Sequence, residues 1–336
     1  MDIRYAVAGD PIGHSLSPLL AALTAAHFKQ AGLSVNISEN CLLQCDDVTV
    51  PMAWAWAGSG RKKPGVPSRL FGDLSRERNQ LKLEKVISEV IDTISTAESN
   101  FVPNGESLLF EDADRIKTRR GVTETWISLT APLKHQLSIR SGVACIDDGL
   151  QNGSINQLRW DGVNWHCAGT DGAGLVAVAI HFGFDFDATG VELPLLCLTG
   201  GGGAARSCAA EWATMGGQIW FKGGRRALDS RGPWVDSLVE GEDVAKMIGP
   251  RLYINFDESS VLDSDADLHV NSRYELASPE IMVNSTESGL RLNGRWLLAA
   301  QHLIAWARLF SPEAAHLIPG LGLTMTRLQL AESLLR

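Results

Sequence analysis

A strand, a glycine-rich turn, a helix and a second strand, in this order, most constrain the fold of this chain. Residues 193–198 are a short apolar run that leads directly into four glycines and two alanines, and residues 218–221 are the second expected strand. This order makes a βαβ unit, whose strands pair in parallel through a right-handed crossover. The sequence therefore predicts an α/β protein that contains a Rossmann-type dinucleotide-binding domain.

The turn has the glycine spacing that lets a backbone approach a pyrophosphate. Gly200 permits the tight bend, Gly202 leaves room for the phosphates, and Ala205 keeps helix and strand close. The helix start offers unpaired N–H groups and a partial positive charge. A glycine turn without a ligand is the alternative, but the flanking strand and helix favour a cofactor. The residues of the turn expected to bind it are Gly200, Gly202, Gly203, Ala204 and Ala205.

The end of the second strand indicates which dinucleotide binds. NAD enzymes carry an acidic residue there for the ribose, whereas this chain has no acid and continues with Lys222, Arg225 and Arg226. Cations suit a 2′-phosphate, so the sequence favours NADP(H) over NAD, with Lys222 and Arg225 as its ligands. A merely exposed basic turn is the alternative.

Length and charge limit the other classes of function. A chain of 336 residues suggests two domains, and 30 Lys and Arg against 39 Asp and Glu give a net charge of −9. That charge argues against a nucleic-acid or membrane partner, and the short basic run at residues 61–63 is interpreted as solvated. The six cysteines are scattered along the chain, which suggests reduced thiols, and we expect no metal site. We also expect neither a leader peptide nor a membrane-spanning apolar run. The expected location is the cytoplasm.

The first 120 residues combine a regular start with an irregular insertion. Residues 3–8 predict a strand, and residues 17–30 a helix with Ser17 as N-cap and Pro18 at its first position. Between about 40 and 120 the pattern degrades, except for an amphipathic helix at about 81–94. We expect this helix to dock on the sheet of the same domain, and residues 58–72 to be mobile.

Two segments resemble the shikimate dehydrogenase family. Residues 5–18 (YAVAGDPIGHSLSP) are similar to its N-terminal signature, and residues 129–134 (LTAPLK) to the strand end that carries its catalytic lysine. A rival match at residues 48–51 lacks the lysine. Spacing favours Lys134, which stands 22 residues before Asn156, itself 15 before Asp171, as in the family.

The resemblance implies a reaction and a set of site residues. The reaction is reduction of 3-dehydroshikimate to shikimate by NADPH, with Lys134 and Asp171 catalytic. A lysine ammonium can stabilise the oxyanion left by hydride transfer and supply its proton. The residues implied to bind substrate are Ser15, Ser17, Thr130, Asn156 and Gln301. Those implied near the nicotinamide are Asn284 and Thr286.

The expected organisation is a substrate domain at 1–175 containing the insertion, an NADP-binding domain at 176–295, and C-terminal helices at 296–336 that return to the substrate domain. The expected partner is a small-molecule substrate, and the expected state a monomer or homodimer. Three departures from the family, Ser128, Gln157 and Gly169, put the substrate in question. A quinate or aminoshikimate dehydrogenase, or a catalytically idle ligand- or partner-binding relative, remain alternatives.

Overall fold

The chain has two compact α/β units, each with its own sheet. The computed structural model describes residues 1–57, 76–94, 122–257, 266–274, 284–286 and 289–335, without the side chains of 76–81 and 284–286. Unit 1 comprises residues 1–169 and 302–336, and unit 2 comprises residues 170–301. The sheets each contain six described strands, which confirms the predicted α/β class. No helix in the described ranges has the length and apolar character that a membrane span requires.

Unit 1 is built around β1, a strand from Asp2 to Gly9 that is buried at every position but the first. Parallel neighbours on both sides explain why its sequence is almost continuously apolar. The sheet order is β2-β1-β3-β5-β6-β4, in which β5 is antiparallel to both of its neighbours. The other strands are β2 (Asn36–Gln44), β3 (Thr123–Leu129), β4 (Ala144–Cys145), β5 (Gln157–Trp160) and β6 (Trp165–Ala168).

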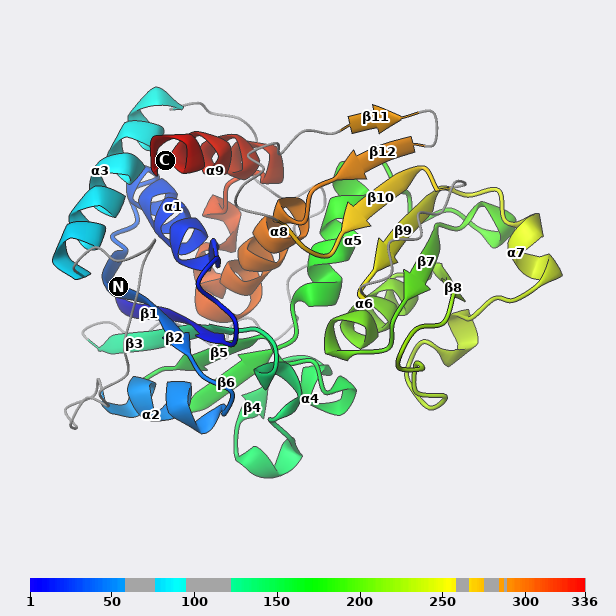
Figure 1. Cartoon of the computed structure of the whole chain (residues 1–336), viewed down its shortest axis with the longest axis horizontal. Helices are drawn as coiled ribbons and strands as arrows, with labels where there is room; N and C mark the ends of the chain where they lie inside the picture. The colour runs from blue at the N-terminus through cyan, green and yellow to red at the C-terminus, as the bar shows by residue number, and fades with distance from the viewer. Residues whose placement is uncertain (58–75, 95–121, 258–265, 275–283, 287–288, 336) are drawn as a thin grey trace. The chain divides into compact units, whose positions relative to one another are not determined.

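Helices cover both faces of this sheet. Figure 1 shows α1, α3 and α9 grouped on one side and α2 on the other. Within unit 1 the helices are α1 (Ser17–Gln30), α2 (Thr49–Ala57), α3 (Arg76–Thr93), α4 (Gly149–Asn152) and α9 (Leu321–Leu335). The C-terminal helix α9 packs on the N-terminal helix α1.

The helix predicted within the insertion forms, but it packs on helices rather than on the sheet. α3 contacts α1 and α9, and Leu83, Val86 and Val90 are buried side chains of this helix. Its Lys82 ammonium donates to the Leu335 carbonyl oxygen at 2.7 Å. The prediction that this helix docks on the same unit is correct. The prediction that it packs on the sheet is wrong, because α1 lies on that face of the sheet and α3 packs on α1. Residues 58–72, expected to be mobile, lie outside the described residues.

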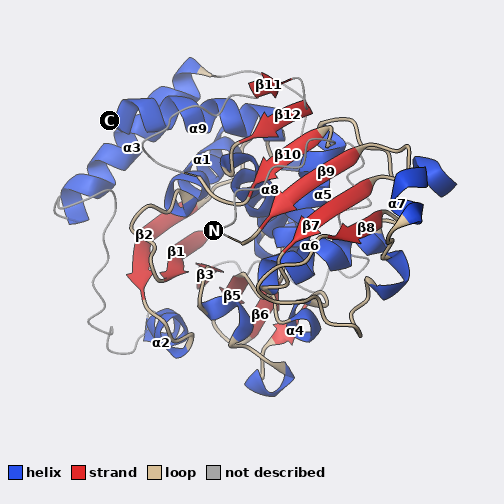
Figure 2. Cartoon of the chain, turned by 45° about the vertical axis from the view of Figure 1, so that its right-hand side comes forward, coloured by secondary structure: helices blue, strands red, loops and turns tan. Residues whose placement is uncertain are grey.

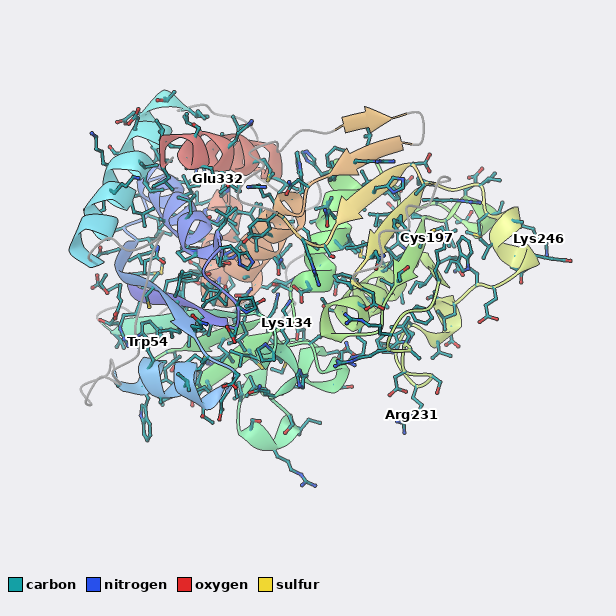
Figure 3. The ribbon with its side chains drawn as sticks, viewed as in Figure 1. Trp54, Lys134, Cys197, Arg231, Lys246 and Glu332 are labelled. Atoms are coloured by element: carbon teal, nitrogen blue, oxygen red, sulfur yellow. The ribbon has the colours of Figure 1, made fainter. Side chains whose placement is uncertain are left out.

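A buried arginine fastens α2 to the sheet. The Arg4 side chain is paired with Glu39 at 2.8 Å, and it also donates to the Trp54 carbonyl oxygen at 3.1 Å. Its guanidinium stacks 4.0 Å from the centre of the Trp54 ring, which lies on α2 (Figure 3). The Trp-rich start of the insertion is thereby part of the core of unit 1.

A second buried arginine connects the sheet to the C-terminal segment. Arg159 on β5 forms two hydrogen bonds with the Glu124 carboxylate on β3, at 2.8 and 3.0 Å. It also donates to the Leu309 carbonyl oxygen at 2.7 Å. Near this pair, Trp126 of β3 stacks on Phe310 with ring centroids 4.7 Å apart.

Unit 2 contains the βαβ unit predicted from the glycine turn. β7 (Leu195–Thr199) and β8 (Gln218–Phe221) pair in parallel and are joined by α6 (Gly203–Thr214). The sheet order is β11-β12-β10-β9-β7-β8, parallel except for β11, with α5 and α6 on one face (Figure 2). The remaining elements are α5 (Asp171–His181), α7 (Glu242–Lys246), β9 (Arg251–Asn255), β10 (Leu268–Asn271), β11 (Asn284–Thr286) and β12 (Gly289–Leu292). α8 (Arg295–Ala305) begins in unit 2 and ends in unit 1.

One buried histidine should make the stability of the fold depend on pH. Burial lowers the pKa of His302 to about 3, and its Nδ1 atom has no hydrogen-bond partner among the described atoms. In the unfolded chain a histidine ionises near pH 6.5. As the pH falls from about 6.5 towards 3, the unfolded chain binds a proton here that the folded chain does not, so stability is lost.

We predict that His302→Leu removes this loss. For the wild type, this group alone should lower the free energy of unfolding by about 2 kcal/mol between pH 7.5 and pH 5. Urea unfolding at both pH values measures it, and His316→Gln, at an exposed position, is the control. An identical pH dependence in the His302 variant and the wild type would contradict the assignment.

Candidate active site

The loops that follow β1 and β3 meet at the carboxyl end of the sheet in unit 1. The Asp10 N–H donates to the Ala131 carbonyl oxygen, and the Thr130 N–H to that of Ala8, both at 2.9 Å. A side chain at Gly9 would collide with Thr130 and Ala131, so this close approach requires glycine. β1 lies between β2 and β3, and ligands of open α/β sheets bind at such a reversal of strand order.

Ser15 and Ser17 lie where the first of these loops becomes α1. Ser17 is the first residue of α1, and the flanking cap position is Leu16, without a side-chain cap. The Ser17 N–H instead contacts the Ser15 hydroxyl oxygen at 3.3 Å. The prediction of Ser17 as N-cap is therefore wrong. The Ser15 N–H donates to the Ile12 carbonyl oxygen, and the turn that this bond closes places Leu16 at the cap and starts the helix one residue earlier than predicted.

Thr130, Lys134 and Asn156 are brought to the same end of the sheet. Thr130 follows β3 directly, and half-buried Lys134 lies in a single helical turn just beyond it (Figure 3). Asn156 is 1% exposed, and its carbonyl oxygen accepts from the Leu129 N–H at 2.7 Å. The rival segment at residues 48–51 enters α2 instead of ending a strand.

Two of the three departures from the family pattern bond to each other. Ser128 and Gln157 face each other across β3 and β5. The Ser128 hydroxyl donates to Gln157 Oε1 at 2.8 Å and lies 2.7 Å from the Tyr5 hydroxyl. All three residues are buried. The two substitutions thus form one internal hydrogen-bond chain, which explains why they can occur together without leaving Ser128 unpaired in the core.

The third departure, Gly169, lies close to its neighbours. A side chain at this position would press on the Ser154 carbonyl and on Gly149. The Gly169 N–H donates to the Asp147 carboxylate at 2.7 Å, and the Gly149 N–H donates to the same group at 2.8 Å. Removal from water raises the pKa of Asp147, an effect that these two N–H groups oppose. Asparagine would not fit here without a shift of the backbone.

Asp171 and Gln301 belong to unit 2. Asp171 is the first residue of α5 and is 2% exposed. Gly174, one turn further along α5, lies against the backbone of Gln301 on α8. The structure therefore brings α5 and α8 together, and with them the two predicted residues of this unit.

The glycine turn lies at the carboxyl end of β7, between β8 and β9. Gly200 has a φ of +96°, which glycine adopts without strain. Space is open beside Gly202, where an added Cβ would meet no atom within 4 Å, and α6 begins at the next residue. Gly203, Ala204 and Ala205 are the first three residues of α6, and Ala205 is fully buried.

Lys222 and Arg225, two of the basic residues beyond β8, contact different groups. The Lys222 ammonium lies 4.3 Å from the centre of the Trp220 ring. The Arg225 side chain is 3.5 Å from the Asp257 carboxylate. That carboxylate lies against Gly200, just beyond the end of β9. Both residues stay exposed, so these contacts leave them accessible, and their predicted role at a 2′-phosphate stays a prediction.

Two other arginines converge on the glycine turn. Arg206 on α6 donates to the Gly201 carbonyl oxygen at 3.4 Å, and the Arg226 backbone lies against Gly201. Burial and the nearby Arg226 guanidinium both lower the pKa of Arg206. Like charges held close together at a helix start are typical of an anion site. In the sequence Arg226 stands only within a basic run, and no sequence pattern indicates that Arg206 lies beside it.

Asn284 and Thr286 are the ends of the short strand β11, antiparallel to β12. Their side chains lie outside the described residues, so their predicted role near the nicotinamide stays a prediction.

The fold is similar to that of solved shikimate dehydrogenases. Shikimate 5-dehydrogenase from Thermus thermophilus, in complex with shikimate, aligns over 98% of this chain and 99% of its own, with a TM-score of 0.51 and 15% identity. The Mycobacterium tuberculosis shikimate dehydrogenase aligns over 97% and 98%, with a TM-score of 0.50 and 14% identity. A T. thermophilus complex with NADP(H) and shikimate aligns over 98% and 99%, with a TM-score of 0.50 and 16% identity. No family model and no curated protein sequence matches the chain. The chain has the two-domain shikimate dehydrogenase fold, including the Rossmann-type domain.

Proposed function

We propose that this protein is an NADP(H)-dependent dehydrogenase that interconverts a ketone and an alcohol on a small polyhydroxy carboxylate. The leading reaction is 3-dehydroshikimate plus NADPH giving shikimate. The observation that carries the proposal is the pairing of the loops after β1 and β3, which gathers Ser15, Ser17, Thr130, Lys134 and Asn156 at one end of the unit 1 sheet. A complex of similar fold contains shikimate and NADP(H).

The residues of unit 2 fit a dinucleotide. The open space beside Gly202 and the N-terminus of α6 suit a pyrophosphate, and the arginines at 206 and 226 suit an additional phosphate. When bound, NADPH supplies the hydride that reduces the ketone carbon. We therefore propose unit 2 as the cofactor-binding part and unit 1 as the substrate-binding part.

The residues of unit 1 would bind and polarise the substrate. The hydroxyls of Ser15 and Ser17, beside the start of α1, would hold the carboxylate. Lys134 would stabilise the negative charge that develops on the carbonyl oxygen and donate the proton that completes the alcohol. Asn156 and Thr130 would bind ring hydroxyls. Asp171 would orient the Lys134 ammonium and Gln301 would contact the substrate, roles that follow from the family resemblance.

A related substrate is the second candidate. The family has asparagine at the position of Ser128, whereas here the shorter Ser128 side chain bonds internally to Gln157. A hydrogen-bond donor to the substrate is thereby replaced, which favours a substrate with a different ring substituent, such as quinate or an aminoshikimate.

The cytoplasm is part of the same proposal. None of the six cysteines, all of which lie among the described residues, forms a disulfide, and Cys145 and Cys167 are directly opposed on β4 and β6. Cysteines that remain reduced throughout a chain suit a reducing compartment.

We predict that Lys134→Met lowers turnover by about 10²–10⁴-fold, the typical contribution of general acid–base catalysis. Methionine keeps the apolar stem and removes the charge, so NADPH affinity should be nearly unchanged. Steady-state kinetics and NADPH fluorescence titration measure the two effects. His135→Ala, at the exposed neighbouring residue, is the matched control and should retain activity. Retention of more than about a tenth of wild-type turnover by the lysine variant would refute its catalytic role.

We predict that cofactor selectivity depends on Arg206 and Arg226 more than on Lys222 and Arg225. The double variant Arg206→Met/Arg226→Met should weaken NADPH binding by about 10- to 100-fold, because charge-assisted hydrogen bonds to the extra phosphate are lost, and should barely change NADH binding. The double variant Lys222→Met/Arg225→Met is the matched comparison and should have the smaller effect. Equal weakening of NADPH and NADH by the first variant would show that these arginines do not select the cofactor.

A further inference from the structure

Unit 1 contains a cavity that the proposed dehydrogenase does not use. It has a volume of about 650 Å³ and lies between α1, β2 and the inserted helix α3, which run beside each other in Figure 1. Pockets for small ligands typically span about 300–1,000 Å³. None of the residues that line it belongs to the candidate active site. The cavity exists because α3 forms its outer wall.

The floor of the cavity is apolar. Small side chains of α1 leave the space, and branched side chains of β2, of Val35 just before it and of α3 enclose it. The residues that matter here are Ala22, Ala26, Val35, Ile37, Ile87 and Ile91. Such a lining suits an aliphatic or aromatic group, which gains free energy when it leaves water.

The rim carries opposite charges on opposite walls. Lys29 is an exposed residue at the end of α1, while Glu84 and Asp92 belong to α3. The Ser88 hydroxyl contacts the Asp92 carboxylate at 3.4 Å, which holds that carboxylate on the α3 side. A ligand that spans this rim needs an anionic group towards α1 and a cationic group towards α3.

A polar residue of β2, Asn40, lies beside the apolar floor. Asn40 on β2 lines the cavity and is only 9% exposed. Its Nδ2 donates to the Pro18 carbonyl oxygen at 2.7 Å, whereas its Oδ1 has no hydrogen-bond partner among the described atoms. Because this oxygen is itself buried, it does not face the space that a ligand would fill, and the polar contacts available to a ligand are those of the rim.

We propose that this cavity is a binding site for a small amphoteric molecule with an apolar body, of the class of apolar α-amino acids. The apolar side chain enters between α1 and α3. The carboxylate pairs with Lys29, and the ammonium pairs with the Glu84 carboxylate on the facing wall of α3. The site is separate from the proposed dehydrogenase reaction and does not depend on it.

Calorimetric titration of the full chain tests the ligand class. L-Phenylalanine and L-leucine should bind with one site per chain. Phenylacetate, which lacks the ammonium, and phenethylamine, which lacks the carboxylate, should bind at least about tenfold more weakly, the loss expected for one charge-assisted contact. L-Glutamate should not bind, because its side chain is charged. Equal binding of phenylacetate or phenethylamine, or binding of no amino acid, would overturn the proposal.

Variants test the place of binding. Lys29→Gln should weaken the binding of L-phenylalanine at least about tenfold. Lys85→Gln, at an exposed lysine of α3 outside the cavity, should leave this binding unchanged. In the same way, Glu84→Gln should weaken L-phenylalanine binding at least about tenfold. Glu89→Gln, at an exposed glutamate of α3 outside the cavity, is its control and should leave binding unchanged. Ala26→Trp fills the cavity and should abolish binding, with circular dichroism as the check on folding. Unchanged binding in Lys29→Gln and Glu84→Gln would move the site elsewhere and contradict the proposal.

Discussion

The buried ion pair between Arg159 and Glu124 holds together the parts on which the candidate site depends. It joins β5 to β3, and a third hydrogen bond from Arg159 reaches the C-terminal segment at Leu309. The side chains are 0% and 3% exposed, so removal of one partner would leave a charge buried without compensation, which typically costs about 3–5 kcal/mol. The pair therefore fixes the register of β3 against β5, and this register sets Asn156 beside the loop that carries Lys134.

Both units use the same rule to place polar groups. In each, a glycine stands at the carboxyl end of a central parallel strand, Gly9 in β1 and Gly200 after β7, and that strand has a neighbour on either side. The reversal of strand order leaves a crevice at the carboxyl ends, and a glycine is needed where the adjoining loops approach. The hydrogen bonds between the loops after β1 and β3 are the observed result in unit 1.

The sequence predicted best those features that depend on neighbours along the chain. The βαβ unit, the helix at residues 17–30 and the amphipathic helix within the insertion were all indicated by local patterns. The sequence failed where distant residues decide. The packing of α3 on α1 and α9 depends on which surface α1 leaves uncovered. The approach of Arg206 to Arg226 depends on how the chain between them turns. The hydrogen bond from Ser128 to Gln157 depends on the register of β3 against β5. Ser17 was misplaced by one residue because the Ser15 turn competes with its capping role.

We propose that the site assembled by β1 and β3 turns over a polyhydroxy carboxylate with NADP(H). The most direct measurement follows NADPH absorbance when the full chain and NADP⁺ are given shikimate, quinate or an aminoshikimate in turn. We expect NADPH formation with at least one of the three, and the fastest with shikimate. Turnover of none of them, in a preparation that still binds NADPH, would refute the proposed dehydrogenase activity and would favour a catalytically idle relative of the same fold.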